Sequence, residues 1–71
     1  MNHALLAENI AYIYFLKKYG SLRANEYRRG HTIELVSKEV GKAFVFDFLV
    51  ERNVYRFKCK DGKVRVTKEV V

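Results

Sequence analysis

The stretch KAFVFDFLVERN, residues 42–53, decides the fold, because it can form either a buried helix or a buried strand. Seven of the eight residues from Ala43 to Val50 are apolar, and Asp47 is the only break in the run. Periodicity cannot separate the two structures in so continuous an apolar segment. We expect a helix over 42–53, because the sequence that ends it is typical of a helix that stops at a C-capping Asn53. A strand is the close alternative, since Phe and Val favour pleated surfaces.

The sequence that follows predicts a β-hairpin. Val54–Lys60 and Lys63–Val70 flank Asp61-Gly62, a pair suited to a two-residue type I′ turn. Pairing the two residues beside the turn fixes the register and gives one apolar face and one cationic face. The predicted cross-strand pairs are Lys60–Lys63, Cys59–Val64, Lys58–Arg65, Phe57–Val66 and Arg56–Thr67.

The first part of the chain predicts an amphipathic helix over Ala4–Tyr19, followed by Gly20 as a C-terminal stop. Its expected apolar stripe, with three- and four-residue spacing, is Leu5, Leu6, Ile10, Tyr12, Ile13, Leu16 and Tyr19.

The middle of the chain predicts shorter elements. The polar stretch 21–31 can hold a short strand over 21–23 and a short helix over 24–29, with Gly30 as a breaker. Thr32 can cap a further helix over Ile33–Val40 through its hydroxyl.

Length and composition place these elements in one small domain, residues 1–71. About half of the residues are apolar, yet no apolar run approaches the roughly 20 residues of a membrane span. A single cysteine, Cys59, cannot form an internal disulfide, and the chain does not open with a secretory signal. We therefore expect a soluble protein of the cytoplasm that does not bind membranes.

The positive charge lies in two blocks. The net charge is +6, and residues 17–29 carry five basic residues and one acidic one, whereas residues 56–71 carry six basic and two acidic. Like charges directly opposed on a hairpin destabilise the pairing unless an anion relieves them. A phosphate backbone would do so, with an affinity that falls steeply with salt. The alternative is a solvated face whose cations discourage edge-to-edge aggregation.

The order of these elements resembles the winged helix-turn-helix DNA-binding family. The resemblance is carried by YFLKKYGSLRANEYRR at 14–29, similar to the first two helices of that family, and by FLVERNVYRFKCKDGKVRVTK at 48–68, similar to the end of a recognition helix and a wing. It implies an α+β fold of three helices with a C-terminal two-stranded β-hairpin wing. The third helix would enter the major groove.

We expect a non-enzymatic, double-stranded DNA-binding protein that acts as a transcriptional regulator. Phosphate contacts are expected from Arg23, Arg28, Arg29, Arg56, Lys58, Lys60, Lys63 and Arg65. Contacts near base edges are expected from Ser37, Lys38 and Lys42.

Two other interpretations are open. An inactive nuclease-like fold would use Asp47 and Lys60, but Lys58 stands where a second acidic metal ligand is required. A protein-interaction module would form a homodimer through Tyr14, Phe15 and the apolar residues around Phe46, which is compatible with DNA binding. Neither His3 nor His31 belongs to a recognisable metal-ligand spacing, so we expect no metal and no cofactor.

Overall fold

The computed structural model describes residues 3–39 and 43–70 as two helices followed by four strands. Helix α1 spans His3–Tyr19 and helix α2 spans Ser21–Arg29. The strands β1 (Thr32–Glu39), β2 (Ala43–Val50), β3 (Asn53–Lys60) and β4 (Lys63–Val70) form one antiparallel sheet in the order β1-β2-β3-β4.

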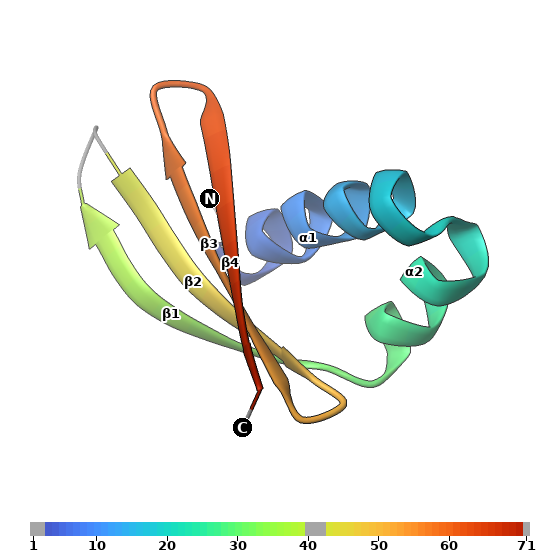
Figure 1. Ribbon diagram of the computed structural model, residues 1–71. Coiled ribbons are helices and arrows are strands. Elements are labelled where there is room, and N and C mark those ends of the chain that lie inside the picture. Colours follow the sequence, from blue (N-terminus) through green and yellow to red (C-terminus); the bar gives the residue numbers. More distant parts are fainter. Residues whose placement is uncertain (1–2, 40–42, 71) are drawn as a thin grey trace.

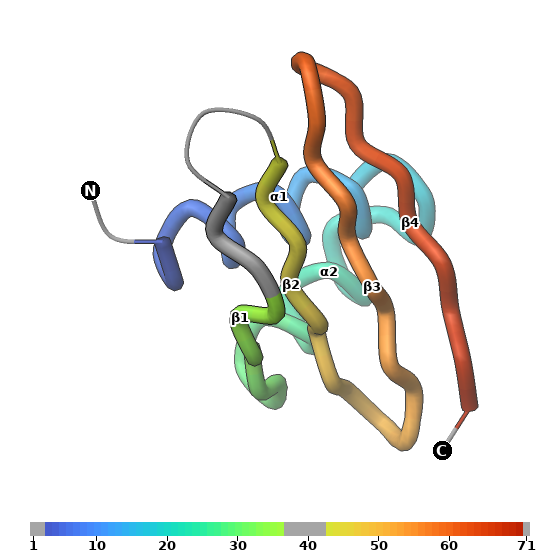
Figure 2. The backbone as a smooth tube through the Cα atoms, turned by 90° about the vertical axis from the view of Figure 1, so that its left-hand side faces the viewer, coloured from blue at the N-terminus to red at the C-terminus, as the bar shows by residue number. Residues whose placement is uncertain are grey.

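Both helices lie on one face of this sheet (Figure 1). When the molecule is viewed from the left-hand side of Figure 1, the sheet lies in front of the helices, and β1 and β4 are its edges (Figure 2). The molecule therefore has two layers, and one face of the sheet is open.

The predicted winged helix, with three helices and a two-stranded wing, is wrong: the described residues form two helices and a four-stranded antiparallel sheet. The predicted helix 33–40 is strand β1 as far as Glu39, because Ile33 pairs with Phe48 and Leu35 with Phe46 across the sheet. Residues 40–42 lie outside the described ranges. The expected helix 42–53 is strand β2 followed by a turn at Glu51 and Arg52.

Segment β2 is a strand because its aromatic residues alternate. Phe46 and Phe48 are buried, and together with Phe44 and Val50 they form one row toward the helices. Asp47 belongs to the opposite row, which faces away from the helices. A helix would place these phenylalanines around its circumference, where two helices could not cover them all.

The hairpin prediction is confirmed, register included. Each predicted pair, from Lys60–Lys63 to Arg56–Thr67, is present between β3 and β4. Asp61 and Gly62 have φ angles of 50° and 74°, as a type I′ turn requires.

The helical layer differs from the prediction in two respects. Residues 21–23 belong to α2 and do not form a strand. The face of α1 that packs on the sheet consists of Ala7, Ala11 and Phe15, each fully buried, whereas Leu5 and Ile13 of the predicted stripe are about half exposed. Small side chains allow the helix to approach a sheet lined with aromatic rings.

Phe15 lies at the centre of the core. Its ring centroid is 4.9 Å from that of Tyr55, 5.0 Å from Tyr27 and 5.1 Å from Phe48. Phe15 and Phe46 are both 0% exposed, so they cannot form the dimer face suggested by the sequence.

Candidate nucleic-acid interface

The open face of the sheet carries the side chains that point away from the helices. Antiparallel pairing arranges them in rows across the strands. The row nearest the β3–β4 turn contains Ala43, Lys60 and Lys63, and the next contains Val45, Lys58 and Arg65. Further rows contain Asp47, Arg56 and Thr67, and then Leu49, Val54 and Glu69.

Four cations gather at the end of this face beside the turn, and we call this cluster the basic end: Lys58, Lys60, Lys63 and Arg65. All four are exposed and, together with Asp61, they line a shallow hollow of about 470 Å³. Lys60 lies directly opposite Lys63, and Lys58 opposite Arg65. Among the residues whose side chains the structure describes, 3–36 and 43–70, no salt bridge involves any of the four.

A second hollow continues from the basic end along the same strands. It measures about 240 Å³ and shares Lys58 with the first. Its other lining residues are Val54, Arg56, Thr67 and Glu69. The two hollows form a strip along the β3–β4 hairpin that is basic at the turn and becomes mixed in charge toward Glu69.

Arg56 differs from the basic end because it is paired. Its Nε donates to Asp47 Oδ1 at 2.7 Å and its Nη2 to Asp47 Oδ2 at 2.9 Å. The hydrogen bonds and the charge of Asp47 raise the pKa of the Arg56 guanidinium. The Asp47 side chain is only 13% exposed. It holds Arg56 in an ion pair, so the four cations of the basic end are the ones that remain available to a ligand.

The role of Asp47 was not predicted from the sequence. While the strand assignment of β2 was open, only a metal-ligand role was considered for this residue. Once β2 is a strand, its register places Asp47 directly opposite Arg56, and charged side chains at directly opposed positions interact.

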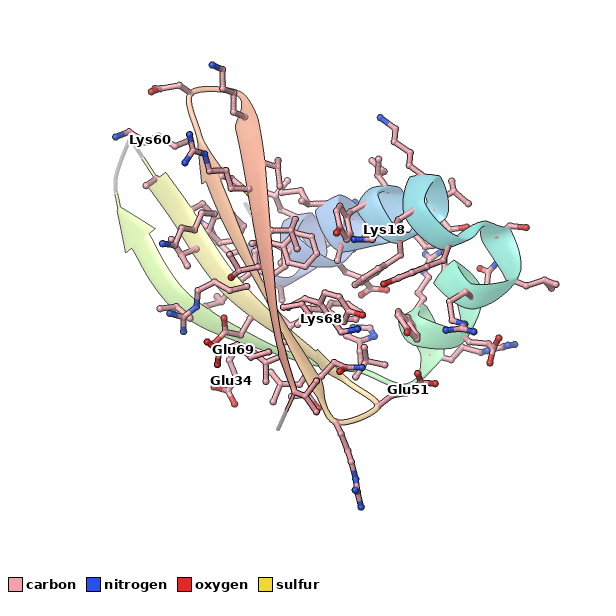
Figure 3. All side chains as sticks on the ribbon, in the orientation of Figure 1. Lys18, Glu34, Glu51, Lys60, Lys68 and Glu69 are labelled. Carbon is pink, nitrogen blue, oxygen red and sulfur yellow. The ribbon has the colours of Figure 1, made fainter. Side chains whose placement is uncertain are left out.

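The first basic block of the sequence lies in the other layer. Arg23, Arg28 and Arg29 are on α2, behind the sheet when it is viewed from its open face (Figure 2). The labelled Lys18 and Lys60 likewise lie on opposite sides of the sheet (Figure 3). The structure does not bring the two basic blocks together around a helix.

Several cations of the helical layer have partners within the fold. Arg28 Nε donates to Glu8 Oε1 at 3.3 Å, and its guanidinium lies 5.0 Å from the centre of the Tyr12 ring. Arg23 lies 5.9 Å from the ring centres of both Tyr19 and Tyr27. These contacts give the two arginines a packing role between the helices and their aromatic neighbours.

The residues expected near base edges do not share a helix. Ser37 and Lys38 are on β1, where a bulge interrupts the register between Leu35 and Ser37. Lys42 lies outside the described residues. The recognition helix on which the expected base contacts depended is therefore not formed.

His31 and Cys59 have structural surroundings. His31 Nδ1 is 3.0 Å from the Tyr27 carbonyl oxygen, and its ring stacks on Phe48 at a centroid distance of 4.5 Å. Cys59 is half-buried, and burial raises the pKa of its thiol, which makes it a poor nucleophile. Over the described ranges, no group of three or more His, Cys, Asp or Glu side chains is placed to hold a metal ion.

The described helices also lack the length and apolar character needed to cross a membrane. Comparisons with protein-family models, with curated proteins and with solved structures found no match to this chain.

Proposed function

We propose that the protein binds double-stranded DNA through its basic end, with Lys58, Lys60, Lys63 and Arg65 contacting phosphates. The observation that carries the proposal is the direct opposition of these four cations around one hollow. None of them forms a salt bridge with a side chain in the ranges 3–36 and 43–70, where side chains are described. Opposed like charges weaken the pairing of two strands. Phosphates bound in the hollow would relieve this repulsion and release their condensed counterions.

A duplex fits this face better than a single strand does. Proteins that bind single strands usually stack bases on exposed aromatic rings. All five Tyr and five Phe residues lie in the described ranges, on the helices or in the core-facing rows of β2 and β3. The open face offers positive charge without a stacking platform, which favours recognition of a phosphate backbone.

The mode of contact also predicts low sequence specificity. Phosphate contacts position a protein on a duplex, whereas contacts to base edges specify the sequence. The basic end consists of three lysines and one arginine on two strands of a four-stranded sheet, an arrangement that suits contacts to phosphates. A transcription-regulating role, which the sequence resemblance implied, requires a preference for particular sites and stays a prediction.

Charge reversal at the turn tests the proposal. The variant Lys60→Glu/Lys63→Glu should lose most of its affinity for a random-sequence duplex, while its circular dichroism spectrum stays that of the wild type. The double substitution Lys17→Glu/Arg29→Glu makes the same change in net charge on the helical layer. It should keep more of the affinity, because its sites lie away from the open face.

The measurement is fluorescence anisotropy of a labelled duplex at low salt. Equal losses of affinity in the two double variants would mean that net charge alone attracts the DNA, and would refute the proposed interface. An unchanged affinity in the Lys60→Glu/Lys63→Glu variant would refute it as well.

A further inference from the structure

Strand β4 is a regular and exposed sheet edge. All eight of its residues pair with β3 without a shift in register, and in the described structure no strand occupies its other side. Val64 is 48% exposed and Val70 76% exposed. The opposite edge, β1, is interrupted by a bulge, a device that blocks pairing at an edge. Of the two edges, β4 is the one suited to adding a strand.

The hairpin register determines which backbone groups are free. In a two-residue hairpin, the pair beside the turn exchanges both backbone hydrogen bonds, and such pairs then alternate along the ladder. Lys63 and every second residue after it therefore bond to β3. The N–H and C=O groups that point outward belong to Val64, Val66, Lys68 and Val70.

We propose that β4 pairs antiparallel with β4 of a second copy of this chain, about a two-fold axis at Thr67, to form a continuous eight-stranded sheet. A two-fold axis normal to the sheet keeps both helical layers on one side and both open faces on the other. In this register, outward-pointing residues meet outward-pointing residues, so every free donor and acceptor along the shared edge gains a partner.

The side chains of β4 complement themselves in this register. On the open face, Arg65 lies opposite Glu69 of the partner subunit, and the symmetry repeats the pair. Both side chains are exposed, so the pair is weak. Unlike Arg56, which is held by the largely buried Asp47, Arg65 can exchange Glu69 for a phosphate. On the other face, Val64 lies opposite Val70 of the partner subunit, so the two exposed valines of the strand cover each other, and Val66 lies opposite Lys68 of the partner subunit. Opposite charges and β-branched apolar residues are favourable cross-strand pairs.

When the two-fold axis is shifted by one residue in either direction, the side chains of the two β4 strands complement each other less well. With the axis at Val66, Lys63 would face Glu69 of the partner subunit, but Val64 would no longer meet Val70 of the partner subunit, and Val70 would extend beyond the paired strand. With the axis at Lys68, the two copies of this lysine would oppose each other. The Thr67 register alone matches both the charges and the valines.

The helical side of the edge supplies more apolar surface. A hollow of about 280 Å³ between α1 and β4 is lined by Ile10, Ile13, Tyr14, Lys17 and Val64. Ile13 is 52% exposed. Because this hollow adjoins the proposed pairing edge, the helical layer of the second copy would reduce its exposure to water.

Disulfide trapping tests the pairing and its register. In a Cys59→Ala background, Thr67→Cys places two thiols at the axis, in a pair that lacks backbone hydrogen bonds. The Cα atoms of such a pair are about 4.5 Å apart, within the range that a disulfide accepts. The matched control is Arg65→Cys in the same background, whose two Cα atoms would be about 14 Å apart.

Mild oxidation of dilute protein should give a covalent dimer of the Thr67→Cys variant and leave the Arg65→Cys variant monomeric on non-reducing gels. Absence of the Thr67→Cys dimer in a folded sample would overturn the proposal. Equal cross-linking of both variants would overturn the register.

Charge exchange gives a second, non-covalent test. Arg65→Glu puts carboxylates opposite each other at two places in the dimer and should raise its dissociation constant about 10-fold or more. Adding Glu69→Arg to the same chain restores opposite charges at positions 65 and 69. The dissociation constant of the dimer should then return to within about 3-fold of the wild-type value. Failure of this rescue would contradict the Arg65–Glu69 pairing.

Sedimentation equilibrium without DNA measures these constants. A wild type that stays at 8.4 kDa at every concentration reached would overturn the dimer. Because no nucleic acid is present, the outcome is independent of the proposed DNA binding, in which Arg65 also takes part.

Discussion

The variant Asp47→Asn is expected to bind DNA more strongly than the wild type, although it removes the ion pair of the open face. Asp47 accepts both hydrogen bonds that Arg56 donates to it. The asparagine side chain has nearly the same shape but carries no charge. Arg56, which is exposed and next to Lys58, would then become a fifth cation available to phosphates.

The size of the effect follows from the number of phosphates neutralised. Four contacts from the basic end give a slope of log affinity against log salt of about −3.6, and a fifth contact steepens it to about −4.5. Between 50 and 200 mM salt, the loss of affinity should therefore increase from about 150-fold to about 500-fold. The free energy of unfolding should fall, because a largely buried acceptor of two charge-assisted hydrogen bonds is weakened.

The assay is a salt titration of duplex binding by anisotropy, together with urea unfolding of the free protein. The matched control is Glu8→Gln, which removes the other ion pair, Glu8–Arg28, from the helical layer. Its slope should equal that of the wild type. A steeper slope in Glu8→Gln and not in Asp47→Asn would refute the assignment of the interface to the open face.

Three further predictions concern the fold. Phe15→Ala should lower the free energy of unfolding by about 3–5 kcal/mol in urea titrations, whereas Leu22→Ala, at a side chain 83% exposed, should change it by less than about 0.5 kcal/mol. Burial and the hydrogen bond shared with Tyr19 raise the pKa of Tyr55 above its ordinary value of 10; the folded state then resists ionisation, so stability should be intact below pH 10 and decline above it, and Tyr55→Phe should flatten that decline in alkaline titrations. Gly62→Ala, at a φ of 74°, should cost about 1 kcal/mol, and Gly30→Ala, at a φ of −127°, should cost much less; equal costs would contradict the turn geometry.

Local signals in the sequence were sufficient for the C-terminal hairpin. Asp61-Gly62 specifies its own turn, and a two-residue turn specifies the register of both strands. The five cations of the predicted face are on the open face for this reason. The cationic face of the hairpin could therefore be predicted from the sequence without knowledge of the rest of the fold.

The other strands were not predictable from local pattern. Strand β2 is apolar at nearly every residue. One side of the strand packs on the helices, and the other side contains Val45 and Leu49. The alternation of apolar and polar residues that marks a half-buried strand is therefore absent from its sequence. Strand β1 has its alternation interrupted by the bulge after Leu35. The apolar residues of β1 therefore have a spacing that also suits a short helix.

The buried face of α1 was misassigned because spacing alone was used to choose it. The predicted stripe from Leu5 to Tyr19 left out Ala7, Ala11 and Phe15, which are the residues that pack on the sheet. Charge clustering in the sequence also failed to show that Arg28 and Lys60 lie in different layers, because only the tertiary fold decides which basic segments share a surface.

The decisive measurement is the salt dependence of wild-type binding to a random-sequence duplex, compared with binding to the same sequence as a single strand. Four phosphate contacts per chain should give a preference for the duplex and a slope near −3.6. Binding that does not respond to salt, or no binding at low salt, would contradict the assignment of the basic end to a phosphate backbone.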